Sequence, residues 1–364
     1  MLREWKEPVR PGEEELKMRL AAAREKLAAQ QLLIKEQKVP VLVLLEGWGT
    51  AGKGYCIGQI IENIDPRHFK VESMERKTEE EERKPFLYRH FTRIPEAGKF
   101  VFLDSGWMDE VVEERLHGEL SEEKYAKRIE SVRRFERQLT DNGYLVMKFF
   151  LHISKKEQTR RMERLTDEKD TVWRVGKKDL WQNSHYEKCM DAFSSYLKST
   201  NMPSAPWYIV DAKSKKWTEL QVLETLTQGI DIALDNRDMA VPLLQNVFPL
   251  ERMPLLSEIP LDKTLDEETY RKELKHLKQR LGELHNRLYR KKVPVIIAYE
   301  GWDAAGKGGN IKRITSALDP RGYEVHPIAS PEPHEKARHY LWRFWTRLPK
   351  TGHIAIFDRS WYGR

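Results

Sequence analysis

A glycine-rich segment that ends in a lysine offers the clearest chemistry in this sequence. Residues 301–308 read Gly-Trp-Asp-Ala-Ala-Gly-Lys-Gly and follow the short apolar run Val295–Tyr299. In a turn between a strand and a helix, backbone N–H groups point at one anion, and Lys307 adds a compact positive charge for terminal phosphates. The glycines expected to face the phosphate are Gly301, Gly306 and Gly308. The pattern predicts a phosphate-binding loop; a merely structural glycine turn is the alternative.

Two carboxylates accompany this loop. Loops of this kind usually place Ser or Thr after the lysine to bind Mg²⁺, whereas Gly308 has no side chain. Asp303 inside the loop offers an oxygen ligand instead, and Asp358, which closes the apolar run Ile354–Phe357, offers a second. Because ligands bind at the carboxyl edge of a parallel sheet, this pair indicates metal-assisted phosphoryl transfer. For Asp358 taken alone, the alternative is a cap of the next helix.

Arginines follow the second carboxylate. Phosphoryl transfer depends mostly on positioning and on neutralisation of charge, so arginines beside a metal site are expected to clamp phosphate. Arg359 is therefore predicted to be catalytic together with Asp303, Lys307 and Asp358. Further phosphate contacts are predicted for Arg343, Arg347 and Arg364. Arg343 and Arg347 are expected on one helix with Arg338 and His339, around 338–347.

The loop belongs to a long internal repeat. The segment 39–54 returns as 293–308 at an offset of 254, with ten of the sixteen positions identical. The same offset, without a gap, carries Asp104 onto Asp358. A period of this length is far too long for a solenoid unit and indicates a duplicated domain.

The first copy differs from the second where the chemistry lies. Lys53 and Asp104 persist, but Gly49 stands at the position of Asp303, and Ser105 stands at the position of Arg359. A loop without its carboxylate and its clamp arginine still binds an anion and is a poor catalyst. We therefore expect the first copy to be catalytically degraded and the second to do the chemistry.

Composition excludes several classes of protein. The longest apolar stretch is far shorter than the ~20 residues that span a bilayer, the start lacks a secretory signal, and two cysteines make neither a disulfide framework nor a zinc site. A cytoplasmic protein without membrane association is predicted. The net charge of +7 favours an anionic partner, or reflects only a slightly basic surface.

Strand and helix patterns alternate along each copy. Apolar runs without alternation, Val41–Leu45 and Val295–Tyr299, are typical of strands buried on both faces of a parallel sheet. The pattern predicts an α/β fold, a three-layer α/β/α domain with a mainly parallel sheet, duplicated in tandem. Each copy begins with an amphipathic helix, Glu13–Lys38 or Asp266–Lys292, which either forms a pairing surface or packs on its own domain.

The further elements expected in the first copy are strands at 70–75, 100–103, 145–151 and 207–210 and helices at 82–92, 121–142, 155–165 and 180–200. The predicted domains are a complete N-terminal one at 1–240, a linker at 241–264 and the front half of the catalytic one at 265–364. We expect such a half domain to leave sheet edge and apolar surface uncovered, so that the chain as it stands is poorly soluble or inactive.

Several ordered motifs resemble the polyphosphate kinase 2 family. In the second copy these are Gly-Trp-Asp-Ala-Ala-Gly-Lys-Gly, Leu-Asp-Pro-Arg-Gly, Phe-Trp-Thr-Arg-Leu-Pro and Phe-Asp-Arg-Ser-Trp-Tyr-Gly-Arg. The first copy continues the likeness through 149–155, the basic Arg160–Arg164 and 205–208. The tandem arrangement resembles the two-domain polyphosphate:AMP phosphotransferases.

The resemblance implies a P-loop kinase-like α/β fold with a mobile lid, which in the first copy lies around Arg160–Arg164. It implies transfer of a phosphoryl group from inorganic polyphosphate to AMP, giving ADP, with Mg²⁺ or alternatively Mn²⁺. Asp303 and Asp358 match the family's metal-associated acids, and Lys307 and Arg359 match its loop lysine and arginine. In the tandem members the C-terminal copy is the active one, and a homo-oligomer is expected. An extended phosphate chain accounts for the basic surplus better than nucleic acid does.

Two other functions stay open. One is a kinase of the same fold that uses ATP as the donor or ADP as the acceptor. The other is a non-catalytic pseudokinase fragment. Formation of ADP from AMP and polyphosphate, without ATP, distinguishes these alternatives.

Overall fold

The structure is a computed structural model that describes residues 2–74, 77–235 and 253–363. The chain folds into two compact units: residues 1–77, 87–239 and 333–339 form the first, and residues 78–86, 240–332 and 340–364 form the second. Each is described by itself. The part of the predicted linker at 241–252 lies outside the described residues.

The first unit is built on a five-stranded parallel sheet in the order β2-β3-β1-β4-β5. The strands are β1 (Val41–Gly47), β2 (Phe69–Ser73), β3 (Phe100–Asp104), β4 (Leu145–His152) and β5 (Trp207–Asp211). Central β1 pairs with β3 on one side and with β4 on the other. Its residues Val41–Leu45 are buried, as their unbroken apolar run predicted.

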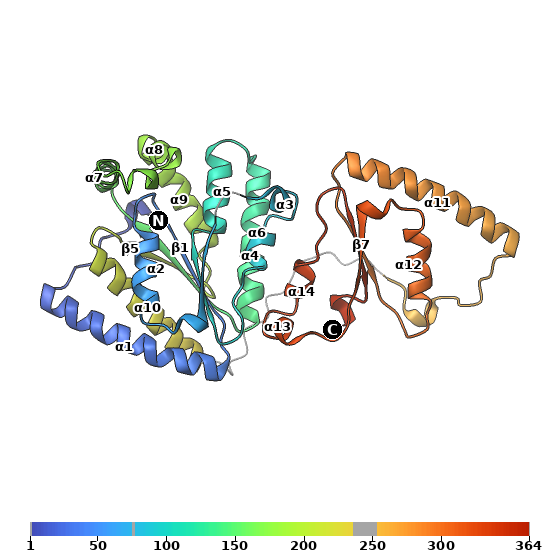
Figure 1. Ribbon diagram of the computed structural model, residues 1–364, viewed down its shortest axis with the longest axis horizontal. Coiled ribbons are helices and arrows are strands. Elements are labelled where there is room, and N and C mark those ends of the chain that lie inside the picture. Colours follow the sequence, from blue (N-terminus) through green and yellow to red (C-terminus); the bar gives the residue numbers. More distant parts are fainter. Residues whose placement is uncertain (1, 75–76, 236–252, 364) are drawn as a thin grey trace. The chain divides into compact units, whose positions relative to one another are not determined.

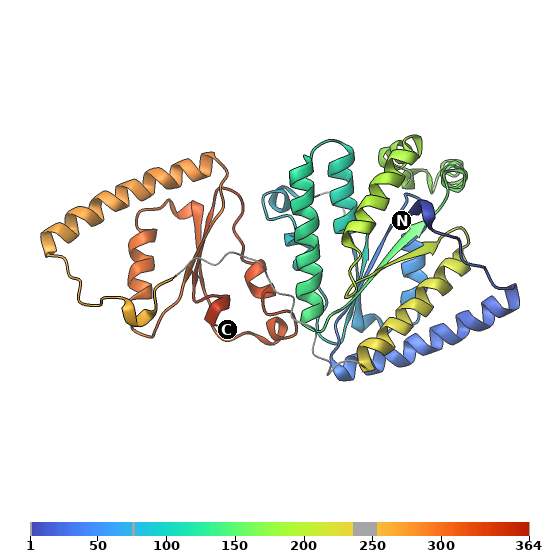
Figure 2. The same cartoon turned by 180° about the vertical axis from the view of Figure 1, so that it is seen from behind.

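Helices cover both faces of this sheet (Figures 1 and 2). They are α1 (Glu13–Gln37), α2 (Lys53–Ile61), α5 (Trp107–Leu116), α6 (Glu122–Asp141), α7 (Lys155–Thr166), α8 (Lys177–Ser184), α9 (Tyr186–Thr200) and α10 (Lys215–Asp235). Helices α1 and α2 pack against α10, whereas α5 and α6 pack against α9. The predicted three-layer α/β/α architecture is therefore confirmed for this unit.

The amphipathic helix α1 packs on its own domain. Leu16, Leu27 and Ile34 on one side of α1 are fully buried, and α1 lies along α10. Between the two alternatives left by the sequence, packing within the domain holds for this helix. None of the described helices is long and apolar enough to span a membrane.

The second unit repeats the front of the first. Strands β6 (Val295–Tyr299), β7 (Tyr323–Pro327) and β8 (Ile354–Asp358) form a parallel sheet in the order β6-β8-β7, with α11 (Glu267–Arg290) and α12 (Lys307–Thr315) around it. Val295 pairs with Ile354 as Val41 pairs with Phe100. The offset of 254 residues in the sequence thus reappears as an identical strand register.

One expectation for this sheet is wrong. Strand β6 is not buried on both faces, because Ile296 is 45% exposed and the strand alternates between half-buried and exposed positions. Among the described residues β6 pairs only with β8. It is an edge strand there, whereas its counterpart β1 is central.

Three predicted helices are shorter or divided. The stretch 82–92 contains only the last residue of α3 (Glu79–Glu82) and all of α4 (Tyr88–Phe91), because Pro85 cannot continue a helix. The stretch 180–200 is divided at His185 into α8 and α9. The helix expected around 338–347 is the single turn α14 (Trp342–Trp345), which follows α13 (Pro333–Lys336) in the sequence.

Candidate functional site

The predicted phosphate loop connects β6 to α12. Gly306 caps α12 with φ 86°, a left-handed conformation that favours glycine, and α12 begins at Lys307. Ala304 in the same loop also has a positive φ, 63°. Gly301 and Gly308 lie exposed on either side of this turn. The loop therefore presents its backbone at a helix N-terminus, the geometry that binds phosphate.

Lys307 is bonded to its own loop. Its Nζ donates to the carbonyl oxygens of Gly301 at 2.8 Å and Trp302 at 2.7 Å. These hydrogen bonds hold the ammonium group at the loop. When phosphate is bound, Nζ can donate to phosphate oxygens in place of these carbonyls. Lys307 is half-buried, whereas its loop neighbours are exposed.

The carboxylate of Asp303 contacts the arginine that follows β8. Arg359 donates through Nη2 to Asp303 Oδ1 at 2.7 Å, so two predicted catalytic residues 56 positions apart meet. Arg359 has φ 68°, an uncommon conformation for a residue with a side chain, and its N–H donates to Tyr299 O at 3.0 Å. Asp358 ends β8 directly before this turn. The structure thus brings Asp303 and Arg359 together at the carboxyl edge of the sheet.

A third acidic residue organises this edge and was missed in the sequence. Glu300 Oε1 accepts hydrogen bonds from Ser360 N at 2.7 Å and from Ser360 Oγ at 2.6 Å. It thereby ties the end of β6 to the turn that carries Arg359. The sequence offered one signal for this residue: the repeat has a glutamate, Glu46, at the matching position.

The other predicted phosphate contacts are placed differently. Arg343 is buried, and its Nη2 donates to Ala329 O at 3.0 Å. Arg347 donates through Nη1 to the carbonyl of Arg343. Arg364 lies outside the described residues. Their part in phosphate binding stays a prediction.

The first copy keeps the backbone geometry of the second. Gly52 caps α2 with φ 94°, Thr50 has φ 60° and Ser105 has φ 64°, each close to its counterpart 254 residues later. A Cβ on Gly54 would lie 3.2 Å from Asp104 Oδ2, so the strand-end carboxylate faces the start of α2. The fold of the loop thus persists where the catalytic side chains do not.

In the first copy the counterpart of Asp303 is Gly49, and the lid, the segment from α7 to α8, packs against it. A Cβ built on Gly49 would lie only 2.0 Å from Oδ1 of Asp179 in α8. Gly49 N also donates to Gln182 Oε1 at 2.7 Å, and Gly49 O accepts from Gln158 Nε2 at 3.2 Å. A lid carboxylate therefore fills the space that a side chain at position 49 requires.

We predict that Gly49→Asp destabilises the first copy and does not restore a second active site. The added side chain overpacks against Asp179 and sets two like charges side by side, which should cost about 1–3 kcal/mol. Chemical denaturation of the full-length protein measures this loss. Gly58→Asp is the control, because a Cβ there meets no atom within 4 Å. Rescue by Asp179→Gly in the Gly49→Asp background is expected; equal stability of Gly49→Asp and wild type would contradict the steric argument.

Beneath the first-copy loop lies a buried carboxyl group. Glu46 Oε1 accepts hydrogen bonds from the N–H groups of Gly106 at 2.9 Å and Asp109 at 3.3 Å. Burial, the largest cause, and the neighbouring Asp109 raise the pKa of Glu46 above its ordinary value. Glu46 thus repeats the structural role of Glu300.

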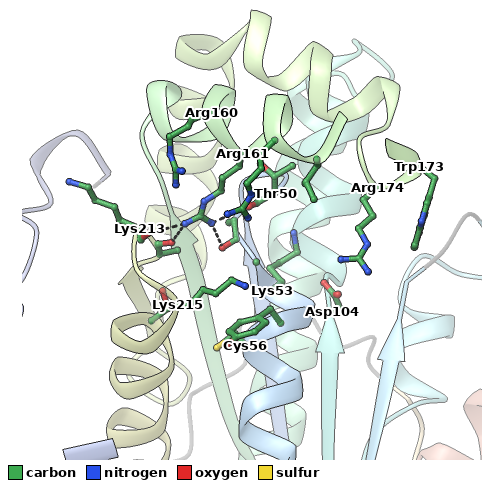
Figure 3. A pocket seen from close by; sticks show the side chains of 18 residues that line it. Thr50, Lys53, Cys56, Asp104, Arg160, Arg161, Trp173, Arg174, Lys213 and Lys215 are labelled. Carbon is green, nitrogen blue, oxygen red and sulfur yellow. Dashed lines mark hydrogen bonds between the residues drawn. The ribbon is translucent and has the colours of Figure 1, made fainter. Parts of the chain in front are cut away.

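The lid predicted around Arg160–Arg164 is helix α7, which is followed by the turn η3 (Val172–Arg174) and α8. Arg161 Nη1 donates to the loop carbonyls of Thr50 at 3.1 Å and Ala51 at 2.9 Å (Figure 3). These bonds hold the lid against the loop of the first copy.

Comparisons with known proteins place this geometry in a family. The family model described as Polyphosphate kinase 2 matches residues 11–238 and 264–364. A polyphosphate:AMP phosphotransferase of Pseudomonas aeruginosa is 35% identical over 94% of this chain and 70% of its own length. One of Pseudomonas syringae is 34% identical over 95% of this chain and 70% of its own length.

A solved structure supports the same relationship. A crystal structure from Pseudomonas aeruginosa assigned to polyphosphate kinase 2 aligns with a TM-score of 0.83 at 32% identity, over 100% of this chain and 72% of the other. The family model matches both copies, and most of the chain aligns with each relative. This chain belongs to the polyphosphate kinase 2 family.

Proposed function

We propose that this protein transfers the terminal phosphoryl group of inorganic polyphosphate to AMP and so forms ADP. The observation that carries the proposal is the phosphate loop before α12, with Asp303 paired to Arg359 across it. Two relatives more than 30% identical are named polyphosphate:AMP phosphotransferase, which supports the choice of substrates.

The residues of the second copy have distinct tasks in this reaction. An oxygen of the AMP phosphate attacks the terminal phosphorus of the chain, the bond to the next phosphate breaks, and the polymer leaves one unit shorter. Lys307 and the loop N–H groups hold phosphate oxygens, and Arg359 neutralises negative charge that builds up on them. Asp303 orients the Arg359 guanidinium through the bond at 2.7 Å.

The donor set at this edge suits Mg²⁺. Mg²⁺ is usually bound by one or two carboxylates together with substrate phosphates and waters, rather than by an all-protein cage. Asp303 and Asp358 supply two such carboxylates, and no group of three or more potential metal-ligating side chains occurs among the residues that the structure describes. These two residues would hold the ion. When bound, it would neutralise charge on the phosphate oxygens.

The cytoplasmic location also remains part of this proposal. Cys56 and Cys189 are free, buried thiols, which is compatible with the reducing compartment predicted from the sequence.

Incubation of the full-length protein with AMP, polyphosphate and Mg²⁺ tests the proposed reaction. We expect ADP to form without ATP and in step with shortening of the polymer. ADP that appears only when ATP is supplied would reject polyphosphate as the donor. If ATP forms from ADP faster than ADP forms from AMP, the preferred acceptor is ADP and not AMP.

Removal of divalent metal tests the proposed role of the two carboxylates. With excess EDTA, ADP formation should fall at least about a hundredfold, since metal neutralisation of phosphate charge supplies several kcal/mol of the barrier. Added Mg²⁺ in excess over EDTA should restore the rate, and Mn²⁺ should replace it at least in part. A rate that is unchanged by EDTA would contradict the proposal of a metal site at Asp303 and Asp358.

A further inference from the structure

The first copy contains a cavity that its lost chemistry does not explain. The cavity has a volume of about 770 Å³ and lies between the loop at Thr50–Gly54, the lid and the connection from β5 to α10. Seven lysines and arginines line it, against one carboxylate, that of Asp104. A degraded site under no demand to bind would have no need to keep such an excess of one charge.

Two of these cations share one carboxylate. Arg160 and Arg161 both pair with Glu157 at 2.7 Å, so one of their two positive charges is offset. Arg161 also donates to the loop carbonyls of Thr50 and Ala51 and forms part of the cavity wall. Contacts to a ligand are therefore expected mainly from the other five cations.

The other five cations have no anionic side chain within salt-bridge distance among the described residues. They are Lys53, Arg164, Arg174, Lys213 and Lys215. Figure 3 shows Lys53, Arg174 and Lys215 extending into the space between loop and lid, whereas Lys213 points outward. The inward cations come from three separate segments of the chain, so they surround the cavity rather than line one side. An uncompensated set of this kind favours a ligand with several negative charges.

Aromatic rings at the rim favour a phosphate chain over a nucleoside. Lys215 lies over the ring of Tyr55, with Nζ 4.2 Å from the centroid, and Arg174 lies 5.4 Å from the ring of its neighbour Trp173. Each ring thus already carries a cation on one face. The rings hold the cations in place and do not form a slot between two aromatic faces for a base.

We propose that the first copy binds inorganic polyphosphate in this cavity and does not transfer it. The loop N–H groups before α2 and Lys53 hold one end of the anion, and Arg164, Arg174 and Lys215 hold the following phosphates. Transfer does not occur because Gly49 and Ser105 replace the carboxylate and the arginine, and because Asp179 fills the space at position 49. The choice of ligand rests on the proposed function, while the binding test does not need turnover.

A second, non-catalytic site has a physical consequence for a polymeric substrate. Two binding sites on one chain raise the effective concentration of a polymer at each of them, provided the polymer spans both. The first copy would then retain the substrate while the second shortens it.

Calorimetric titration with inorganic tripolyphosphate tests the proposal in the full-length protein carrying Lys307→Gln. This background removes the loop lysine of the second copy and leaves the first copy intact. We expect one bound tripolyphosphate per chain, and at least a tenfold weaker affinity when Lys53, Arg164 and Lys215 are all replaced by Gln. The control replaces Lys70, Arg133 and Lys198, three exposed cations away from the cavity, and changes the net charge equally. This control should bind as the Lys307→Gln protein does.

Three results would overturn the proposal: no binding by the Lys307→Gln protein, equal weakening by both triple variants, or ADP binding in the cavity more tightly than tripolyphosphate. In the wild-type protein the number of bound tripolyphosphates should fall from two to one in the cavity variant, which gives an independent measurement should Lys307→Gln disturb folding. Thermal melting of each variant monitors the fold. ADP formation is assayed separately, so activity without cavity binding rejects only this inference, and binding without activity rejects only the proposed function.

Discussion

Asp303→Asn is expected to lower kcat for ADP formation about a hundredfold or more, the size of loss seen when one preorganised electrostatic group is removed from an active site. The substitution keeps the shape of the side chain and removes its charge. It weakens a proposed metal ligand and the bond to Arg359 Nη2 at 2.7 Å at the same time. Initial rates at saturating AMP and polyphosphate in the full-length protein measure the effect.

The matched control for this variant is Asp262→Asn. Asp262 is an exposed aspartate outside the helices and strands, and its replacement should change kcat less than about twofold. Excess Mg²⁺ should recover part of the activity of Asp303→Asn if metal binding is the dominant loss, and should have no effect if orientation of Arg359 dominates. An Asp303→Asn protein within about threefold of wild type would remove Asp303 from the mechanism.

Lys307→Ala is expected to lower kcat by about two orders of magnitude as well. The ammonium group is the compact cation of the loop, whose other charged side chain, Asp303, is anionic, so its loss leaves phosphate charge uncompensated there. Because Nζ also bonds two loop carbonyls, the variant could act through loop structure instead. Lys307→Arg separates the two effects: it keeps the charge and changes the geometry, and recovery of at least part of the rate would support the electrostatic role.

Lys312→Ala is the control within the same helix. Lys312 is exposed in α12, about one and a half turns beyond Lys307, and its removal should leave kcat within about twofold of wild type. Equal losses in both variants would indicate a general effect of charge on polyphosphate binding. A melting temperature unchanged by Lys307→Ala, together with the lost rate, would exclude unfolding of the loop as the cause.

The repeat made much of the fold predictable from the sequence. The matching segments 39–54 and 293–308 carry the same apolar strand, glycine turn and helix start, and these local patterns determined the strand register and the left-handed positions of both loops. Where local signals were mixed, prediction was less successful. Pro85 is a signal in the sequence against the helix expected at 82–92, because proline disfavours a helical conformation in the residue before it.

Individual contacts between distant segments could be predicted only in outline or not at all. Nothing in the neighbourhood of Gly49 or Asp179 indicates that they meet, since 130 residues separate them and only the folded lid brings them together. The meeting of Asp303 and Arg359 could be expected in outline because both follow strands of one sheet, but their hydrogen bond required the structure. Burial of Arg343, an arginine predicted to bind phosphate, depends likewise on packing that a charge pattern does not encode.

Transfer of phosphate from polyphosphate to AMP by the second copy is tested by following ³²P from end-labelled polyphosphate in the wild-type protein and in Asp303→Asn, with AMP and Mg²⁺ and without ATP. We expect label in the β-phosphate of ADP for the wild type and at least about a hundredfold less for Asp303→Asn. Label that reaches ADP at the wild-type rate in Asp303→Asn, or only after ATP is added, would contradict it.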